Sequence, residues 1–524
     1  MPEKTSARRE LLVLGVFCGF FFFYGLGAFG LVGADEPRYA QVAREMLQRN
    51  DWVTPTLNGQ PWLEKPVLYY WGAISSYWLF GVRDWAARVP AAVSASLMVA
   101  GVYLLVRRLR AGYEFSGALT ATTSAAVFGF ARGAGTDMPL AACFTLAMLA
   151  WFAWFSGVER EKLWLAAFYF FIAAATLAKG PVAPGLAGII IFLFATTRPK
   201  RWQVLRETLW WPGILLFLAV ALPWYVLAQA RNPQFFQEFI VQQNLARFST
   251  NLYRHEQPFW YYLPVLLMGL FPWTIFALAA FTEAVGDWRQ EDSAEAALGR
   301  FLVIWAAVPV IFFSLSQSKL PGYILPAIPA WTLLAAIYLQ HRAEHAIPLP
   351  GWMLALHALL LAAVSGAVML AIRWMLHPHE PVPSNVLRTA GLVALAVLAL
   401  AWVLARMRGW EMLRLGTLLP LVLAAGFVLR VAAPTIDDTQ SARPLAKQLA
   451  IYPTQTPVSV LGVRRTVEYG LAFYRNQPIA QEQSATGRHL LVAPMDWPLP
   501  PGRHRIFTGE FGPQRLGLWW VEAQ

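Results

Sequence analysis

Charged side chains are scarce in this sequence: Asp, Glu, Lys and Arg together make up 14% of its 524 residues. Soluble domains carry about 25% charged residues. Hydrophobic residues account for 57% of the chain, and the mean hydropathy is +0.46. The shortage of charge therefore excludes an ordinary soluble domain and predicts an all-α polytopic membrane protein.

Cysteine is nearly absent as well. Cys18 and Cys143 both lie inside apolar runs, where a free cysteine packs like a small hydrophobic residue. This placement favours two buried, space-filling side chains over a disulfide or a cysteine-bound metal.

Several nucleotide and metal signatures are also missing. The sequence has no Walker A loop, no G-x-G-x-x-G that opens a helix after a strand, no H-E-x-x-H and no C-x-x-C. These absences argue against a nucleotide-binding domain. The net charge of +12 sits mainly at helix ends and loops, where basic residues set orientation and meet anionic lipid. We therefore expect no nucleic-acid partner and no organic cofactor.

Apolar runs of the length that crosses a bilayer, roughly 20 residues, dominate the first 433 residues. We expect thirteen spans, the first of them a retained helix rather than a signal peptide. The predicted spans are 11–32, 85–106, 115–132, 138–156, 163–178, 183–197, 209–229, 259–282, 299–316, 322–339, 352–374, 388–405 and 414–432.

Basic residues in the short loops predict the orientation. Arg107, Arg160 and Lys200, with their basic neighbours, fall on one side under this span count, and the positive-inside rule makes that side cytoplasmic. The opposite side receives residues 33–84, the later outer loops and the C-terminus.

The chain changes character near residue 434. Its apolar runs become short, and β-prone stretches appear at 458–461, 490–493 and 505–507 after a helical run at 442–449. We therefore divide the chain into a membrane domain (1–433) and a small extracytoplasmic α/β domain (434–524).

The first outer loop is the most polar part of the membrane domain. It opens with Asp35 and Glu36 and contains the pair Glu64 and Lys65 among aromatic residues. Residues 37–49 between them carry apolar side chains at helical spacing, which predicts an amphipathic helix lying in the membrane interface.

Ionisable residues near a bilayer are candidates for function, because they are costly unless they face water or each other. Here they collect on the outer side rather than at the bilayer midplane, where a transporter would need them. This pattern favours a catalytic cavity. Its candidate members are Asp35, Glu36, Arg38, Glu64, Lys65, Arg132, Asp137, Lys179, His255 and Lys319.

Each candidate also has a purely structural interpretation. Asp35 and Asp137 have the chemistry of helix N-caps, and Lys65 resembles a lysine snorkelling from an aromatic belt. His255 is either a metal ligand, an acid–base group or a structural hydrogen-bonding partner. Lys319 and Tyr323 either bind a phosphate or a sugar ring or anchor the membrane edge.

Together, several motifs resemble a known family. They are Gly33 to Tyr39, Asp51 to Pro55, Leu57 to Gly59, Glu64 to Trp71, Ala178 to Pro181, His255 to Tyr262 and Ser318 to Tyr323, with Arg88 and Asp137 between them. The chain is similar to bacterial GT-C glycosyltransferases, in the branch of the 4-amino-4-deoxy-L-arabinose lipid A transferases and their protein-mannosyltransferase-like relatives.

The resemblance implies an inverting, polyprenyl-phosphate-sugar-dependent transferase of the bacterial inner membrane with a periplasmic active site. The expected donor is undecaprenyl phosphate carrying aminoarabinose and the expected acceptor is lipid A, a modification that gives polymyxin resistance. It implies catalytic roles for Asp35 and Asp137, to which we add Glu36, and a divalent metal (Zn, or Mg or Mn) on Glu64 and His255. The expected substrate-binding residues are Arg38, Tyr39, Trp62, Lys65, Tyr69, Arg132, Lys179, Lys319 and Tyr323.

Other functions stay open on the residues alone. A GT-C transferase with another sugar, such as mannose or galacturonic acid, and another lipid, glycan or protein acceptor would share these motifs. A lipid flippase or a scaffold would share the spans. Neutralising Asp35 separates these classes, because only the transferase needs that acid.

Overall fold

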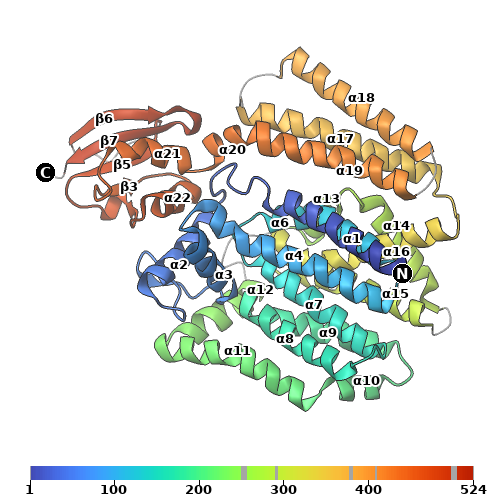
Figure 1. The fold of residues 1–524 in the computed structure, drawn as a ribbon. Coiled ribbons are helices and arrows are strands. Elements are labelled where there is room, and N and C mark those ends of the chain that lie inside the picture. Colours follow the sequence, from blue (N-terminus) through green and yellow to red (C-terminus); the bar gives the residue numbers. More distant parts are fainter. Residues whose placement is uncertain are drawn as a thin grey trace.

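The computed structural model describes residues 2–249, 257–289, 293–376, 382–406, 410–496 and 504–522. Over these residues the chain forms a helical bundle with a small sheet at one end (Figure 1). The predicted class, a helical polytopic membrane protein with a small C-terminal sheet unit, is confirmed.

In the described part of the chain, nine helical segments are long and apolar enough to cross a membrane. Four lie in the first half: α4 (Asp84–Leu109), α7 (Asp137–Phe155), α8 (Glu161–Lys179) and α11 (Trp211–Arg231). The other five are α15 (Ala294–Ser314), η5 (Pro321–Ala327) with α16 (Ile328–Glu344), α17 (Gly351–Leu376), α18 (Ser384–Arg406) and α19 (Trp410–Phe427), which continues through η6 (Val428–Ala432). Each matches one of the thirteen predicted spans.

Three more predicted spans are interrupted or short helices. The first is α1 (Pro2–Cys18) with η1 (Gly19–Phe23), and the third is α5 (Glu114–Thr123) with α6 (Ala125–Ala131). The sixth is α9 (Val182–Thr196), an apolar helix of 15 residues.

The eighth predicted span, 259–282, is not a single helix. It consists of α13 (Tyr262–Gly269) and α14 (Thr274–Gly286), which meet at 116°. Pro272 lies in the break, and a proline removes a backbone donor and disrupts a helix at that point. The Phe271 carbonyl instead accepts a hydrogen bond from the Ala125 amide at 2.7 Å. A bent pair of this kind is either one broken span or a re-entrant loop, so the eighth span stays a prediction.

The first loop contains the predicted interface helix, α2 (Asp35–Arg49), which buries Tyr39, Val42, Ala43 and Met46. A two-stranded ribbon follows, β1 (Thr56–Leu57) and β2 (Gln60–Pro61), and then α3 (Leu68–Phe80). Asn58 and Gly59 form its turn with φ values of 53° and 76°, as a tight hairpin requires. The Glu45 carboxylate accepts both turn amides, at 2.8 and 3.1 Å.

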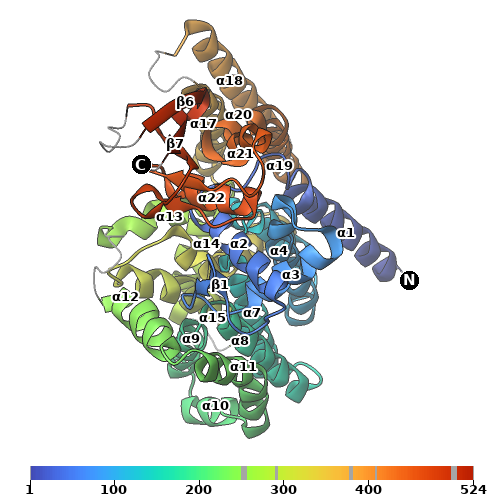
Figure 2. The ribbon, with the colours of Figure 1, turned by 90° about the vertical axis from the view of Figure 1, so that its left-hand side faces the viewer.

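The C-terminal unit is a five-stranded mixed sheet in the order β4-β3-β5-β7-β6. Its elements are α20 (Ala433–Gln440), α21 (Arg443–Gln448), β3 (Val458–Val460), α22 (Arg465–Arg475), β4 (Ala480–Gln481), β5 (His489–Pro494), β6 (His504–Phe511) and β7 (Leu516–Glu522). The three predicted β-prone stretches coincide with parts or all of β3, β5 and β6. Figure 2 looks onto this end of the molecule, where α22 lies beside α2.

The interior of the bundle is built around α7. Trp151 and Phe152 on this helix are buried against Phe194 of α9 and Phe301 of α15, with the Phe152 and Phe301 rings 4.7 Å apart. This packing anchors the C-terminal part of α7, the helix whose first residue is Asp137.

Candidate active site

Asp35 is the first residue of α2 and points its carboxylate to solvent. Its side chain is 57% exposed and forms an ion pair with Arg38, one helical turn further on. A carboxylate in the first turn of a helix is stabilised by the helix dipole. The N-cap position belongs to Ala34, so the capping role that competed with a functional one is not the role of Asp35.

Arg38 lies on a platform of aromatic rings. Its guanidinium carbon is 4.9 Å from the ring centre of Trp62, 5.2 Å from that of Tyr39 and 5.9 Å from that of Tyr469. Aromatic faces attract a guanidinium, and stacking on them fixes the orientation of its plane. The predicted residues Asp35, Arg38, Tyr39 and Trp62 therefore lie together.

A second group forms where α7 begins and α8 ends. Lys179, at the end of α8, forms an ion pair with Asp137, the first residue of α7. The Lys179 amine also lies 4.7 Å from the ring centre of Tyr323. A Cβ added to Gly322 would come within 2.7 Å of the Asp137 carboxyl group. The η5 segment thus approaches Asp137 so closely that glycine is needed there.

Lys65 lies near the second group. Burial, and the positive charges of Arg247 and Lys179, lower the pKa of its amine to about 7, against the opposing effect of Glu64 and Asp137. The amine is therefore surrounded by both signs of charge. It changes ionisation near neutral pH, which is unusual for a lysine.

Tyr39 is close to both Asp35 and Asp137. Burial raises the pKa of its hydroxyl, and the negative charges of Asp35, Asp137 and Glu64 raise it further, while Arg38 lowers it. The Tyr39 hydroxyl is thus near enough to all three carboxylates for each of them to affect its pKa. The starts of α2 and α7, the end of α8 and the Glu64–Lys65 turn form one cluster, which we call the Asp35–Asp137 cluster.

Glu36 is enclosed instead of facing this cluster. Its carboxylate accepts two hydrogen bonds from Arg88, at 2.7 and 3.1 Å, and one each from the amides of Val32 and Ala134, both at 2.8 Å. The Glu36 side chain is 12% exposed and that of Arg88 is 1% exposed. Four donors therefore occupy its two oxygens.

Three other predicted residues make their described polar contacts with backbone carbonyls. Arg132 donates to Phe21, Tyr24 and Gly25, with the shortest distance 2.8 Å. The Tyr69 hydroxyl donates to Ala87 at 2.9 Å, and Lys319 donates to Ser316. The described contacts do not bring Arg132 and Lys319 into the cluster. The Tyr69 ring, in contrast, packs beside that of Tyr39, with the ring centres 6.2 Å apart.

The predicted metal site is only half described. Glu64 belongs to the cluster, whereas His255 lies outside the described residues. Within the described ranges, no group of three or more His, Cys, Asp and Glu side chains is placed to hold a metal ion. Glu64 by itself does not fit a resident zinc, which takes three or four protein ligands. The metal stays a prediction.

Sequence reasoning missed some members of the cluster. Arg247, in α12 (Arg247–Ser249), lowers the pKa of Lys65, and its place in the loop after α11 was a usable signal. The Trp62 indole N–H and the Tyr70 hydroxyl are buried with no hydrogen-bond partner among the described residues. Buried polar atoms of this kind need an explanation, and a polar ligand would provide one.

The molecule also has a cavity of about 690 Å³ away from these charges. It lies among α8, α9, α10 (Arg201–Thr208) and α11 and is lined largely by apolar residues, including Phe168, Ile172, Ile191 and Phe217. None of the charged residues of the Asp35–Asp137 cluster lines it.

Known proteins are similar to this chain over ranges that include residues of the Asp35–Asp137 cluster. The family described as dolichyl-phosphate-mannose-protein mannosyltransferase matches residues 64–226, which contain Lys65, Asp137 and Lys179. A Pseudomonas aeruginosa protein named undecaprenyl phosphate-alpha-4-amino-4-deoxy-L-arabinose arabinosyl transferase is 30% identical over 509 residues, covering 91% of this chain and 90% of that protein. A Pseudomonas fluorescens protein with the same name and the number 2 is 28% identical over 409 residues, covering 77% and 68% of the two chains.

Solved structures share the fold. The crystal structure of ArnT from Cupriavidus metallidurans bound to undecaprenyl phosphate has a TM-score of 0.77 at 23% identity and covers 97% of both chains. The archaeal oligosaccharyltransferase AglB from Archaeoglobus fulgidus has a TM-score of 0.52 at 11% identity, covering 94% of this chain and 70% of that one.

Proposed function

Because the chain belongs to the family of undecaprenyl phosphate-aminoarabinose arabinosyl transferases, we propose that it moves 4-amino-4-deoxy-L-arabinose from undecaprenyl phosphate to a phosphate of lipid A. Membership in this family confirms the resemblance that the motifs indicated. The observation that supports the chemistry is the Asp35–Asp137 cluster, where carboxylates and cations from α2, α7 and α8 meet at one end of the bundle.

The cations of the cluster bind the donor. Lys65, Lys179 and Arg247 are close enough to one another for two of them to depress the pKa of the third. Such a concentration of positive charge suits a phosphate group. It also stabilises the negative charge that develops on the leaving phosphate when the anomeric C–O bond breaks.

Asp35 acts on the other side of the reacting carbon. The acceptor phosphate is already ionised at neutral pH, since its second pKa is near 6, so little base catalysis is needed. Asp35 instead orients the acceptor and stabilises positive charge on the sugar ring. Attack on the face opposite the leaving phosphate inverts the anomeric centre, and Asp137 sets the position of Lys179.

Glu36 receives a positioning role in place of the catalytic one first expected. Its four hydrogen bonds leave no oxygen for a substrate, and they join the start of α2 to α4 and to the loop before α7. The pair with Arg88 holds the backbone on which Asp35 stands.

The location of the protein follows from the same proposal. The donor is a membrane lipid and the nine apolar helices span a bilayer, so we place the chain in the bacterial inner membrane. The basic short loops favour a periplasmic position for the cluster and for the C-terminal α/β domain. A second candidate is transfer of another polyprenyl-phosphate sugar, which the match to the mannosyltransferase family favours.

The test uses purified protein in nanodiscs with radiolabelled undecaprenyl-phosphate aminoarabinose as donor and lipid A as acceptor. We expect transfer by the wild type and a loss of roughly 100-fold or more in Asp35→Asn, the scale of losing one electrostatic partner of a transition state. Asp438→Asn is the matched control, because that exposed acid lies in α20 outside the cluster. A folded wild type that binds the donor without transferring its sugar would contradict the proposal.

A further inference from the structure

The backbone between the first helix and Asp35 is fixed from two sides. On the first side stands Arg88 of α4, which is fully buried. Its guanidinium donates hydrogen bonds to the carbonyls of Leu26, Phe29 and Gly30 at 2.7, 2.8 and 2.8 Å. We call residues 26–32 the link segment, since it leads directly into α2.

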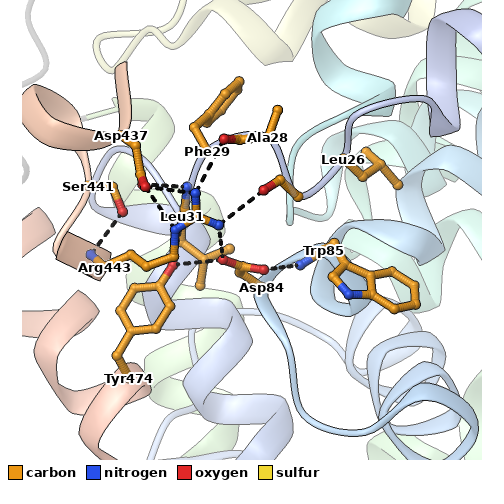
Figure 3. Close-up of polar contacts among 12 residues, drawn as sticks. Leu26, Ala28, Phe29, Leu31, Asp84, Trp85, Asp437, Ser441, Arg443 and Tyr474 are labelled. Atoms are coloured by element: carbon orange, nitrogen blue, oxygen red, sulfur yellow. Dashed lines mark hydrogen bonds and ion pairs between the residues drawn. The ribbon is translucent and has the colours of Figure 1, made fainter. Parts of the chain in front are cut away.

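The second side is supplied by the C-terminal unit. Asp437 of α20 accepts the Gly30 amide, and the Tyr474 hydroxyl of α22 accepts the Leu31 amide, both at 2.8 Å. Arg443 of α21 donates to the carbonyls of Gly27 and Ala28 at 3.0 and 3.3 Å. Figure 3 shows these side chains converging on the link segment.

The same three side chains are tied to each other and to α4. Arg443 forms ion pairs with Asp437 at 2.7 Å and with Asp84, the first residue of α4, at 2.9 Å. The Tyr474 hydroxyl donates to Asp84 at 3.3 Å. A partly buried network of this kind has a defined geometry, because each unsatisfied member would be costly.

The packing around Gly30 leaves no room for a side chain. A Cβ at this position would lie 2.2 Å from the Ser441 hydroxyl and 2.5 Å from the Tyr474 hydroxyl. Val32 also forms an isolated antiparallel bridge with Ser441. The link segment and the C-terminal unit are therefore in direct backbone contact.

Helix α2 itself rests on the same unit. Arg44 donates to the Phe473 carbonyl, and the Gln48 amide donates to Asn476 at 3.1 Å. The Tyr469 ring lies 5.9 Å from the Arg38 guanidinium carbon. The ion pair of Asp35 with Arg38 is internal to α2, so it does not fix where the helix lies. The contacts of α2 with α22 and with α3, and the pair of Glu36 with Arg88, fix it together.

We propose that Arg443, Asp437 and Tyr474 are positioning residues for Asp35, so that the C-terminal unit is a part of the active site's support. This inference rests on the proposed role of Asp35. A displacement of about 1 Å at a reacting group can cost roughly 100-fold in rate. The three residues act through the backbone of the link segment, because their described hydrogen bonds outside the C-terminal unit are with that segment and with Asp84.

The test compares Tyr474→Phe with Tyr452→Phe. The first change removes the hydroxyl that accepts the Leu31 amide. Tyr452, in contrast, is partly buried in the C-terminal unit, where its ring centre lies 5.6 Å from that of Trp520. We expect kcat to fall roughly 10- to 100-fold in Tyr474→Phe with an unchanged KM for the donor. Amide hydrogen exchange in residues 26–36 should become faster in this variant alone.

A graded pair at position 437 separates positioning from simple loss of folding. Asp437→Asn keeps an oxygen that can accept the Gly30 amide but loses the ion pair with Arg443, whereas Asp437→Ala loses both contacts. We therefore expect Asp437→Asn to retain part of the kcat that Asp437→Ala loses. This pair decides the question should Tyr474→Phe fail to fold.

Three outcomes would overturn the inference while leaving the proposed function intact. One is wild-type kcat in both Tyr474→Phe and Asp437→Ala. Another is an equal fall of kcat in Tyr452→Phe, and the third is a matching loss in Asp437→Asn and Asp437→Ala. If the wild type transfers no sugar, the proposed function fails, and unchanged hydrogen exchange in residues 26–36 of the variants overturns this inference separately.

Discussion

The ionisation of Lys65 couples donor binding to pH. Burial and two neighbouring cations bring the pKa of its amine to about 7, so the amine is positive below that pH and neutral above it. A neutral amine attracts a phosphate far less than a cation does. The affinity for the donor should therefore be high at low pH and should decline as pH rises through about 7.

We predict that kcat/KM for the donor falls above about pH 7, and that this decline is absent in Lys65→Arg, whose guanidinium stays charged. Because kcat/KM reports the free enzyme and a bound phosphate raises the pKa of the amine, the decline in kcat should lie at higher pH. Rates between pH 7 and 9 test this, since the acceptor phosphate is ionised there. The exposed Lys447 provides the control Lys447→Arg, and a decline that persists in Lys65→Arg would refute the assignment.

The approach of η5 to α7 is a feature at the scale of whole elements. Gly322 brings this segment against Asp137 and Phe130, and a Cβ there would lie 2.7 Å from the Asp137 carboxyl group and 2.9 Å from the Phe130 ring. Both side chains have few rotatable bonds, so neither contacting group can move far from Gly322. The contact fixes the distance between Tyr323 on η5 and the ion pair of Asp137 with Lys179.

We predict that Gly322→Ala lowers transfer strongly, because it displaces η5 from α7, with a loss of stability of about 1–3 kcal/mol from overpacking. Transfer rates and thermal unfolding in the same detergent measure the two effects. Gly299→Ala is the matched control, since a Cβ on Gly299 in α15 meets no atom within 4 Å. Equal activities of the two variants would mean that the close approach is not required.

At the scale of the whole molecule, the proposed function requires one orientation of the bundle in the membrane. The cluster and the C-terminal unit share one end (Figure 1), and the connection between α7 and α8 lies at the other end of those helices. The periplasmic position of the first end rests on the distribution of basic residues.

Cysteine labelling tests this orientation. In a chain with Cys18→Ala and Cys143→Ala, we predict that Asp438→Cys reacts with a membrane-impermeant maleimide in intact spheroplasts. Arg160→Cys, in the connection between α7 and α8, should react only after permeabilisation. The reverse labelling would place the cluster on the cytoplasmic side and remove the periplasmic assignment.

Much of the site was predictable because it depends on local pattern. Asp35 and Asp137 stand at span boundaries and Lys65 stands in the polar first loop of a chain with few charges. An ionisable group near a bilayer needs water or a partner. The interface helix followed from its apolar spacing, and the tight turn from Asn58-Gly59, since that pair supplies the positive φ values that the turn requires.

Composition and periodicity are local properties of the chain. They were enough to predict the class of the protein, its apolar helices and the polar first loop, and the motifs in that loop indicated the family. Tertiary structure decided which charges meet. It enclosed Glu36 with Arg88, moved Arg132 and Tyr69 onto backbone carbonyls, and brought Arg443 and Tyr474 beside residues 27–31. Those partners lie far apart along the chain, so no local pattern encodes their meeting; the packing of α2, α4, α21 and α22 does.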